Sequence, residues 1–231
     1  MQVVNVLKDY DTLIITGGRM DVKAIRRLLD DLEVMKSDKL NIIAVDGGIE
    51  RADELGIKPT HIIGDFDTVD PDVLKRYMMD ESIQVDSYRP EKDETDTELA
   101  ADLCKRLESK KVLIIGALGG RMDHELSNIF LLEKFNQYGI MAAIADELNV
   151  MVYMTESFYY EKLPSYKYFS LISLSEKIEG LNISGCKYTL SNGTLNQFSS
   201  LCISNEITDE QAEVKFKQGK ILVISSRDRF N

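Results

Sequence analysis

The sequence is poor in cysteine and has no long apolar segment. Its 231 residues include three cysteines, Cys104, Cys186 and Cys202, which are widely spaced and form no CxxC pair. This usage argues against a disulfide framework and against a zinc site. No run approaches the roughly 18 apolar residues of a membrane span, and the N-terminal residues lack the basic flank and apolar stretch of a secretory signal. The sequence therefore predicts a cytoplasmic protein with no membrane segment.

Basic residues are also in deficit. Lysine and arginine total 28 against 39 aspartate and glutamate, which gives a formal charge of −11. Such a surface repels a nucleic-acid backbone, so we expect no nucleic-acid partner. Acidic charge gathered in one cleft would instead hold a hard cation or attract a cationic substrate. Most of the acids are explained by a solvated surface.

The first part of the chain alternates short apolar runs with helical stretches. Runs near 13–15, 42–45, 61–63, 112–115 and 141–144 have no polar alternation, which is typical of buried strands. Asp70-Pro71 and the capping box of Thr95 with Glu98 mark helix starts. Alternation of this kind predicts an α/β domain with a mostly parallel sheet over residues 1–147.

From about Asn149 the pattern changes to short strands. We expect strands near 150–153, 168–172, 201–203, 212–216 and 221–224, with turns at 179–180, 191–193 and 218–219. No convincing helix occurs in this part of the sequence. Residues 148–231 are therefore predicted to form an all-β sandwich or barrel as a second domain.

Acids and glycines follow the expected strands of the first domain. Asp46-Gly47-Gly48 follows one strand, Gly64-Asp65-Phe66-Asp67 the next, and Gly119-Gly120-Arg121-Met122-Asp123-His124 a third. A further acidic cluster, 93–96, opens a helix. Ligands of parallel sheets bind beyond the carboxyl ends of the strands. The sequence thus predicts one functional edge of the sheet.

The acids of this edge suit a magnesium ion. Asp65 and Asp67 are two residues apart, so an extended backbone points both carboxylates to one side. Like charges held together need a cation, or one carboxylate takes up a proton. Carboxylate oxygens suit Mg²⁺, and Asp96 is a candidate third ligand. Two alternatives stay open: an Asx turn at Asp65, and stabilisation of Asp96 by the helix dipole.

The glycines of this edge suit phosphate groups. Gly17-Gly18, Gly47-Gly48 and Gly119-Gly120 would allow backbone N–H groups to approach phosphates. Arg121 could bind two phosphate oxygens. Plain turns are the alternative for each pair. Asp123 could simply cap its helix, and His124 could lie exposed in the first turn.

Five segments, taken in order, resemble the motifs of the thiamine pyrophosphokinase family. The resemblance extends from about Leu13 to Ile224, nearly the whole chain. Order and spacing together make it specific. The segments are Ala44-Val45-Asp46-Gly47-Gly48, Gly64-Asp65-Phe66-Asp67-Thr68, Lys92-Asp93-Glu94-Thr95-Asp96, Gly119-Gly120-Arg121-Met122-Asp123-His124 and Ile203-Ser204-Asn205-Glu206.

The resemblance implies an α/β domain that holds ATP and metal, a β-sandwich that helps to bind thiamine, and a homodimer with sites between subunits. Asp65, Asp67 and Asp96 would hold Mg²⁺. The implied catalytic residues are Asp46, Arg121 and Asp123; the ATP-binding residues are Gly17, Gly18, Gly47, Gly48, Thr95, Gly119, Gly120, Arg121 and His124; the substrate-binding residues are Lys92, Ser204 and Asn205.

Two departures from the family pattern concern Thr68 and tryptophan. Thr68 stands where the family usually has serine. The chain has no tryptophan, so any aromatic partner of the thiamine rings must be a tyrosine, a phenylalanine or an aliphatic residue. In the implied reaction the thiamine hydroxyl attacks the β-phosphorus of ATP and releases AMP. Asp123 is the first candidate for general base and Asp46 the second.

Three other functions remain as alternatives. A pterin diphosphokinase could use the same N-terminal scaffold with another acceptor pocket. An aspartyl-nucleophile phosphatase is suggested by the DxDx[TV] pattern at residues 65–69, although that family carries the motif on its first strand. A non-enzymatic nucleotide sensor is the third alternative.

Overall fold

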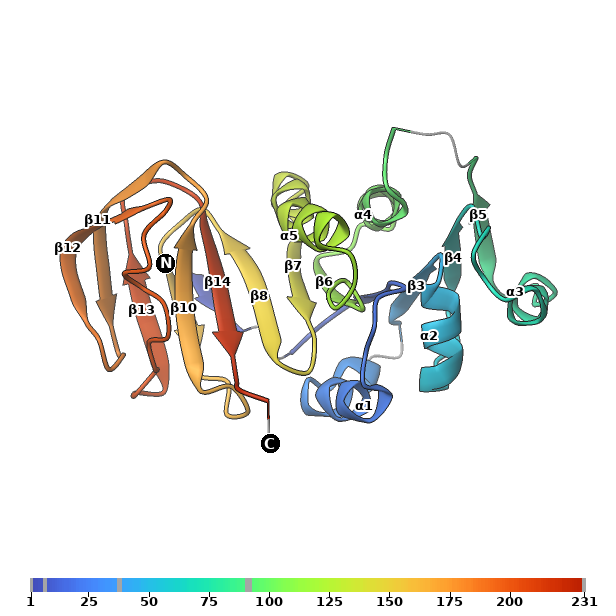
Figure 1. The fold of residues 1–231 in the computed structure, drawn as a ribbon, viewed down its shortest axis with the longest axis horizontal. Coiled ribbons are helices and arrows are strands. Elements are labelled where there is room, and N and C mark those ends of the chain that lie inside the picture. The colour runs from blue at the N-terminus through green and yellow to red at the C-terminus, as the bar shows by residue number, and fades with distance from the viewer. Residues whose placement is uncertain (1, 6–7, 37–38, 90–92, 230–231) are drawn as a thin grey trace. The chain divides into compact units, whose positions relative to one another are not determined.

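The computed structural model describes residues 2–5, 8–36, 39–89 and 93–229. The chain divides into two compact units, one spanning Lys8–Glu147 and the other spanning the chain from Leu148 together with its N-terminal segment (Figure 1). Gln2–Val4, predicted within the N-terminal domain, form strand β1, which pairs in parallel with β9 (Phe158–Glu161) of the second unit. A three-residue strand has too few side chains to show a period of two, so sequence gives little sign of it.

The first unit is a parallel sheet covered by helices, as predicted. Its strands lie in the order β7-β6-β2-β3-β4-β5, and each neighbouring pair is parallel. Helices α4 and α5 cover one face, and α1 and α2 cover the other (Figure 1). The elements are β2 (Thr12–Ile15), α1 (Val22–Asp31), η1 (Val34–Lys36), β3 (Asn41–Val45), α2 (Gly48–Leu55), β4 (His61–Gly64), α3 (Pro71–Met78), β5 (Gln84–Ser87), α4 (Asp96–Arg106), β6 (Lys111–Ile115), α5 (Met122–Gln137) and β7 (Met141–Ala145).

The helix starts of this unit follow the sequence signals. Asp70 caps α3 by accepting hydrogen bonds from the backbone N–H groups of residues 72 and 73, and Pro71 occupies the first helical position. Thr95 Oγ1 accepts from the Glu98 N–H at 3.2 Å and caps α4. Both caps satisfy N–H groups that have no partner within the helix. The predicted starts of α3 and α4 are confirmed.

The strand order creates a crevice at one point of the sheet. From β2 the chain builds β3, β4 and β5 on one side and then crosses back to place β6 on the other side of β2. The connections that leave β2 and β6 therefore run in opposite directions along the sheet edge. Such a switch point opens a crevice at the carboxyl ends of the strands, where ligands of this fold class bind.

The second unit consists of a five-stranded sheet and three antiparallel strands of the other, nine-stranded sheet, and the two layers share a core. A five-stranded sheet has the order β1-β9-β13-β11-β12, and β10-β14-β8 form an antiparallel set. Tyr160 and Phe169, from different sheets, are both buried, and their ring centroids are 5.3 Å apart. The predicted β-sandwich is confirmed. Its remaining strands are β8 (Asn149–Met154), β10 (Tyr168–Ser173), β11 (Lys177–Ser184), β12 (Leu190–Asn196), β13 (Gln211–Lys215) and β14 (Ile221–Ser226).

Several boundaries predicted in this unit are wrong. The expected turns at 179–180 and 191–193 lie inside β11 and β12, because Gly180 and Asn192 take positive φ values of 66° and 48° beside register shifts of the paired strands. A glycine in such a strand marks a bulge, not a turn. The expected strand at 201–203 is a turn, in which Leu201 and Ile203 are exposed.

A buried histidine gives the folded state a pH dependence. His61 on β4 is 6% exposed, and burial lowers the pKa of its imidazole below the ordinary value. As the pH falls, the His61 imidazole therefore takes up its proton at a higher pH in the unfolded chain than in the folded protein. We expect the free energy of unfolding to decrease below about pH 6.5, with a slope of at most ~1.4 kcal/mol per pH unit.

Chemical denaturation of wild type and His61→Gln between pH 5 and 8 measures this contribution. The difference between their unfolding free energies should change with pH below 6.5 and stay constant above it. His124→Gln, at the exposed second histidine, serves as the control. A pH-independent difference for His61→Gln contradicts the assignment.

Candidate active site

A cavity of about 430 Å³ lies at the switch point of the first unit. Residues that follow β2, β3 and β6 line it, so the edge predicted from sequence does form a hollow. Of the predicted nucleotide-site residues, those lining the cavity are Gly17, Gly18, Asp46, Gly47, Gly120, Arg121 and His124. Gly48, Thr95, Gly119 and the other predicted acids lie outside its lining.

Close contact between loops explains the glycines of this edge. A Cβ atom on Gly18 would lie 2.1 Å from the Gly116 carbonyl oxygen, and one on Gly48 would lie 1.9 Å from that of Ile15. The Gly18 N–H donates to the Gly116 carbonyl at 2.9 Å. Glycine is therefore required at positions 18 and 48, because any side chain there would collide with the backbone of a neighbouring segment. The Gly18 N–H is already used and is not available to a phosphate.

Asp46 is held between the ends of β3 and β4. Its backbone has a φ of 46°, and its N–H donates to the Ile63 carbonyl at 3.0 Å. Gly64 leaves the space that its side chain occupies, because a Cβ atom there would lie 1.8 Å from Asp46 Oδ1. A residue with a side chain at position 64 would move this carboxylate. The glycine of the second motif thus positions the aspartate of the first.

The loop after β4 carries two of the three predicted metal acids, Asp65 and Asp67, while Asp96 opens α4. The Asp67 N–H donates to Asp65 Oδ1 at 3.1 Å, so the Asx turn left open by the sequence is present. The negative charge of Asp65 raises the pKa of Asp67, and desolvation and the charge of Asp96 act in the same direction. Phe66 between the two acids is buried and anchors the loop. The Asp67 carboxylate thus lies close enough to both Asp65 and Asp96 to be repelled by them.

This acid group fits Mg²⁺ by donor type and number. Within the described residues, no three histidine, cysteine, aspartate or glutamate side chains form a ready-made metal centre. Mg²⁺ needs only one or two protein carboxylates, because water and phosphate oxygens complete its shell. Asp65 and Asp67 supply that pair, and the repulsion that raises the pKa of Asp67 is what a cation would relieve.

Arg121 and Asp123 form a bidentate ion pair at the start of α5. Arg121 Nε lies 3.1 Å and Nη2 2.5 Å from the two carboxylate oxygens of Asp123. The guanidinium lowers the pKa of Asp123, which makes it a weaker base. Asp123 is not the N-cap, which is Arg121, but lies in the first helical turn. Asp123 Oδ1 does accept from the His124 N–H at 3.0 Å, so Asp123 satisfies one N–H group of the first turn without occupying the N-cap position.

Sequence reasoning missed other residues of the cavity. Glu125 Oε1 accepts from the Gly120 N–H at 2.7 Å, and Asn128 Nδ2 donates to the Ala117 carbonyl at 3.0 Å. Both side chains line the cavity and fix the loop that follows β6. They belong to no glycine or acid motif, and only their spacing along α5 could have indicated a shared face.

Asn205 in the second unit has a structural role. Its Oδ1 accepts from the N–H groups of Tyr188 and Glu206, and its Nδ2 donates to the Tyr188 carbonyl at 2.7 Å. The side chain is buried, whereas the Tyr188 ring is exposed and has Lys187 Nζ 5.6 Å from its centroid. Ser204, which directly precedes Asn205, has a positive φ of 58°. Lys92 lies outside the described residues.

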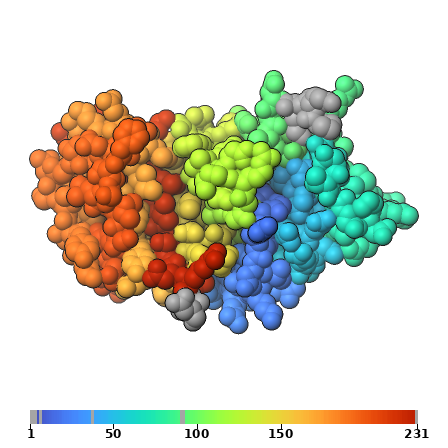
Figure 2. Space-filling model, viewed as in Figure 1, coloured from blue at the N-terminus to red at the C-terminus, as the bar shows by residue number. Residues whose placement is uncertain are grey.

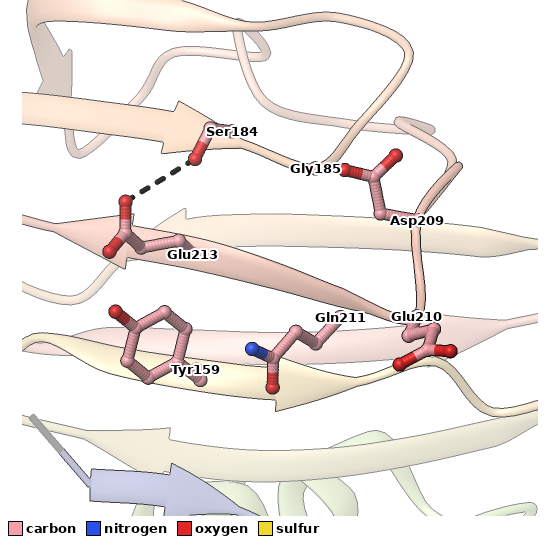
Figure 3. Close-up of a pocket in the computed structure, with 7 residues that line it drawn as sticks. All are labelled: Tyr159, Ser184, Gly185, Asp209, Glu210, Gln211 and Glu213. Carbon is pink, nitrogen blue, oxygen red and sulfur yellow. Dashed lines mark hydrogen bonds between the residues drawn. The ribbon is translucent and has the colours of Figure 1, made fainter.

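A second cavity, of about 420 Å³, lies in the C-terminal unit (Figure 3). Ser184 Oγ donates to Glu213 at 3.4 Å across its wall. Three of its lining side chains are acidic and none is basic among the described residues, so it would repel a phosphate. The lining residues are Tyr159, Ser184, Gly185, Asp209, Glu210, Gln211 and Glu213. No predicted site residue belongs to it.

Both units match known protein families. Residues 32–144 match the family model described as thiamin pyrophosphokinase, catalytic domain, and residues 156–221 match the one described as thiamin pyrophosphokinase, vitamin B1 binding domain. Thiamine pyrophosphokinase of Bacillus subtilis is 32% identical over 204 residues, which cover 88% of this chain and 95% of that protein. The chain belongs to the thiamine pyrophosphokinase family. The resemblance of the five motifs is confirmed.

Solved structures of the family share the fold. The crystal structure of thiamine pyrophosphokinase from Bacillus subtilis has a TM-score of 0.82 at 30% identity, and covers 94% of this chain and 99% of that one. That of thiamin pyrophosphokinase from Geobacillus thermodenitrificans has a TM-score of 0.80 at 30% identity, with 94% and 97% covered.

The candidate residues of this thiamine pyrophosphokinase family member are distributed over the two matched segments. Asp46, Asp65, Asp67, Asp96 and Asp123 all fall within the catalytic-domain match. Gly17 and Gly18 precede it, while Tyr188, Ser204 and Asn205 fall within the vitamin B1 binding match. Thr68, the departure from the usual serine, lines the cavity, so a hydroxyl group is retained there.

Proposed function

We propose that this protein transfers a diphosphate group from ATP to thiamine and produces thiamine diphosphate and AMP. The observation that carries the proposal is the cavity at the switch point, whose lining lies in the segment matched by the catalytic-domain model except for Thr16, Gly17 and Gly18. Glycine-rich loops line it, and the acid pair Asp65 and Asp67 follows a neighbouring strand. This combination suits a triphosphate and its metal.

Arg121 is the proposed phosphate ligand. It lines the cavity, and its side chain is 74% exposed, so it can reorient. Binding a phosphate would exchange the carboxylate of Asp123 for phosphate oxygens of similar bidentate geometry. After this exchange the Asp123 carboxylate would no longer be paired with the Arg121 guanidinium. Gly17 and Gly47 would let the triphosphate approach the backbone, whereas the Gly120 N–H already donates to Glu125.

Asp65, Asp67 and Asp96 are the proposed ligands of Mg²⁺. When bound, the ion would neutralise charge on the phosphate oxygens and help to orient them. The raised pKa of Asp67 supports the choice of these residues, because it reports the like charges of Asp65 and Asp96 beside this carboxylate.

In the proposed reaction the thiamine hydroxyl oxygen forms a bond to the β-phosphorus of ATP. The bond between that phosphorus and the oxygen bridging to the α-phosphorus breaks, AMP leaves with that oxygen, and the hydroxyl proton passes to a carboxylate. Phosphoryl transfer depends mainly on positioning and charge stabilisation. The position of Asp46 in the cavity wall supports it as the acceptor, and Asp123 becomes an alternative once Arg121 has left it.

Charge and aromatic surface support thiamine as the acceptor. Residues Lys8–Glu147 contain 30 acidic and 19 basic residues, and the rest of the chain contains nine of each, so the whole excess of −11 belongs to the α/β unit. This charge would attract the thiazolium cation. Tyr188, whose backbone binds the side chain of Asn205, offers an exposed ring, and Lys187 already shows that a cation can lie near its face.

The proposal includes a homodimer with active sites between subunits, located in the cytoplasm. The family resemblance supports the dimer. Large apolar side chains are exposed on both units, namely Met122, Leu126, Phe130, Phe198, Leu201 and Ile203. Exposed apolar patches of this kind are typical of interaction surfaces. No helix in the described residues has the length and apolar character needed to span a bilayer.

Incubation of the protein with ATP, Mg²⁺ and thiamine tests the proposed function. We expect AMP and thiamine diphosphate in equal amounts. Accumulation of ADP with thiamine monophosphate would contradict transfer of a whole diphosphate unit. Turnover of a hydroxymethyl pterin in place of thiamine would support the pterin diphosphokinase, and a trapped phospho-aspartate would support the phosphatase.

Tyr188 should determine the affinity for thiamine. We expect Tyr188→Ala to raise the KM for thiamine roughly tenfold, because the cation loses an aromatic face. Tyr188→Phe keeps the ring and should stay within about twofold of wild type, and the KM for ATP should not change. Phe198→Ala, at a residue that is 97% exposed, is the matched control. An equal effect of both alanine variants would show that Tyr188 has no specific role.

A further inference from the structure

Helices α4 and α5 both begin at the candidate active site. The first turn of α4 carries Asp96 and Thr97, and Thr97 lines the cavity. The start of α5 carries His124 and Glu125, which also line it. The two helices lie on the same side of the sheet (Figure 1). The relative position of the two helices therefore determines how Asp96, at the start of α4, is placed with respect to the cavity residues at the start of α5.

Burial does not fix the first turns of α5. Only Leu132 and Phe135 are buried among its described residues, and both lie in its second half. Met122, Leu126 and Phe130 are exposed by 46% or more, and Figure 2 shows part of this helix in yellow-green at the surface. Polar contacts made by the second half of α5 add to the burial of Leu132 and Phe135 in holding the helix against α4.

A polar network joins the two helices. Lys134 Nζ on α5 donates to Glu98 Oε1 at 2.9 Å and lies 2.9 Å from Asp102 Oδ1. Tyr138, the C-cap residue of α5, donates its hydroxyl to the same Asp102 oxygen at 2.6 Å. The Lys134 side chain is 23% exposed, so solvent screens these contacts less than those of a surface pair. Glu98 lies in the first turn of α4, two residues after Asp96.

We propose that Lys134 is a positioning residue that holds the first turn of α4 against α5 and so couples metal binding at Asp96 to nucleotide binding at α5. Without its cation, the carboxylates of Glu98 and Asp102 would face each other at a spacing of four residues on one helix and repel. The first turn of α4 would then loosen. This inference rests on the proposed function, because it assigns Asp96 to Mg²⁺ and the cavity to ATP.

Variants at position 134 test the proposal. Lys134→Met keeps the aliphatic stem and removes the charge, and Lys134→Arg restores a cation. Lys105→Met is the matched control, because Lys105 lies 4.3 Å from the Tyr138 ring in the same network but contacts neither Glu98 nor Asp102 in the described structure. Binding of a non-hydrolysable ATP analogue with Mg²⁺ is measured by calorimetry, alongside the steady-state kinetics.

For Lys134→Met we expect the analogue Kd and the Mg²⁺ concentration for half-maximal rate to rise roughly five- to twentyfold. The kcat at saturating Mg²⁺ and ATP should stay within about threefold, and amide exchange in the first turn of α4 should become faster. Lys134→Arg and Lys105→Met should stay within about twofold of wild type.

A lower melting temperature with unchanged analogue affinity and Mg²⁺ requirement would show a merely structural role and overturn the proposal. An equal effect of Lys105→Met would also overturn it. Analogue binding does not depend on turnover of thiamine. If wild type forms no thiamine diphosphate while the binding results follow the expectation, the proposed function fails and the coupling by Lys134 stands.

Discussion

Replacing Asp67 by asparagine should reduce turnover by roughly a thousandfold, because an amide keeps the size of the side chain but not the charge that Mg²⁺ requires. The fold should be preserved, since Asp67 is exposed and asparagine leaves the hydrogen bond from its backbone N–H to Asp65 Oδ1 in place. Without metal, the melting temperature should be unchanged or slightly higher. Asn removes a charge that Asp65 and Asp96 repel.

Three measurements check this expectation. Thermal unfolding in EDTA reports the fold, steady-state rates over a range of Mg²⁺ concentrations report activity, and calorimetry reports binding of the ATP analogue. Asp72→Asn is the matched control, because Asp72 is an exposed acid of the following helix, α3, outside the acid group. Near-normal activity of Asp67→Asn at moderate Mg²⁺ would remove Asp67 from the metal site.

The α/β unit could be predicted from sequence because its signals are local. Each central strand is a continuous apolar run, and the caps at Asp70 and Thr95 lie within three residues of the N–H groups they bind. Parallel strands place their carboxyl ends at one edge, so the positions of Asp46 and Gly120 in the cavity wall followed from the strand assignment alone. Periodicity and capping chemistry suffice for this level of structure.

The details of the site could not be predicted because they depend on contacts between distant segments. The Asn205 amide binds the backbone of Tyr188, 17 residues away, and no local pattern distinguishes it from a ligand-binding amide. The Arg121–Asp123 pair spans only two residues, yet its formation depends on both side chains turning toward each other at the helix start. The bulges of β11 depend on its pairing with β12.

The contact between Gly64 and Asp46 is another such long-range feature, and it leads to the second large expected effect. We expect Gly64→Ala to reduce turnover by more than about a hundredfold and to destabilise the protein by about 1–3 kcal/mol. The new Cβ atom would lie 1.8 Å from Asp46 Oδ1, so the carboxylate has to leave its position in the cavity wall. The φ of 150° at position 64 adds backbone strain for any residue other than glycine.

A double-mutant cycle separates the displaced carboxylate from the backbone strain. In an Asp46→Ala background the atom that clashes is absent, so Gly64→Ala should cost less stability there than in wild type. Gly139→Ala is the matched control for strain, because Gly139 has a φ of 72° and open space where its Cβ would lie. We expect it to cost about 1 kcal/mol and to leave activity unchanged. Equal costs of Gly64→Ala with and without Asp46, or an active Gly64→Ala variant, would show that Gly64 does not position Asp46.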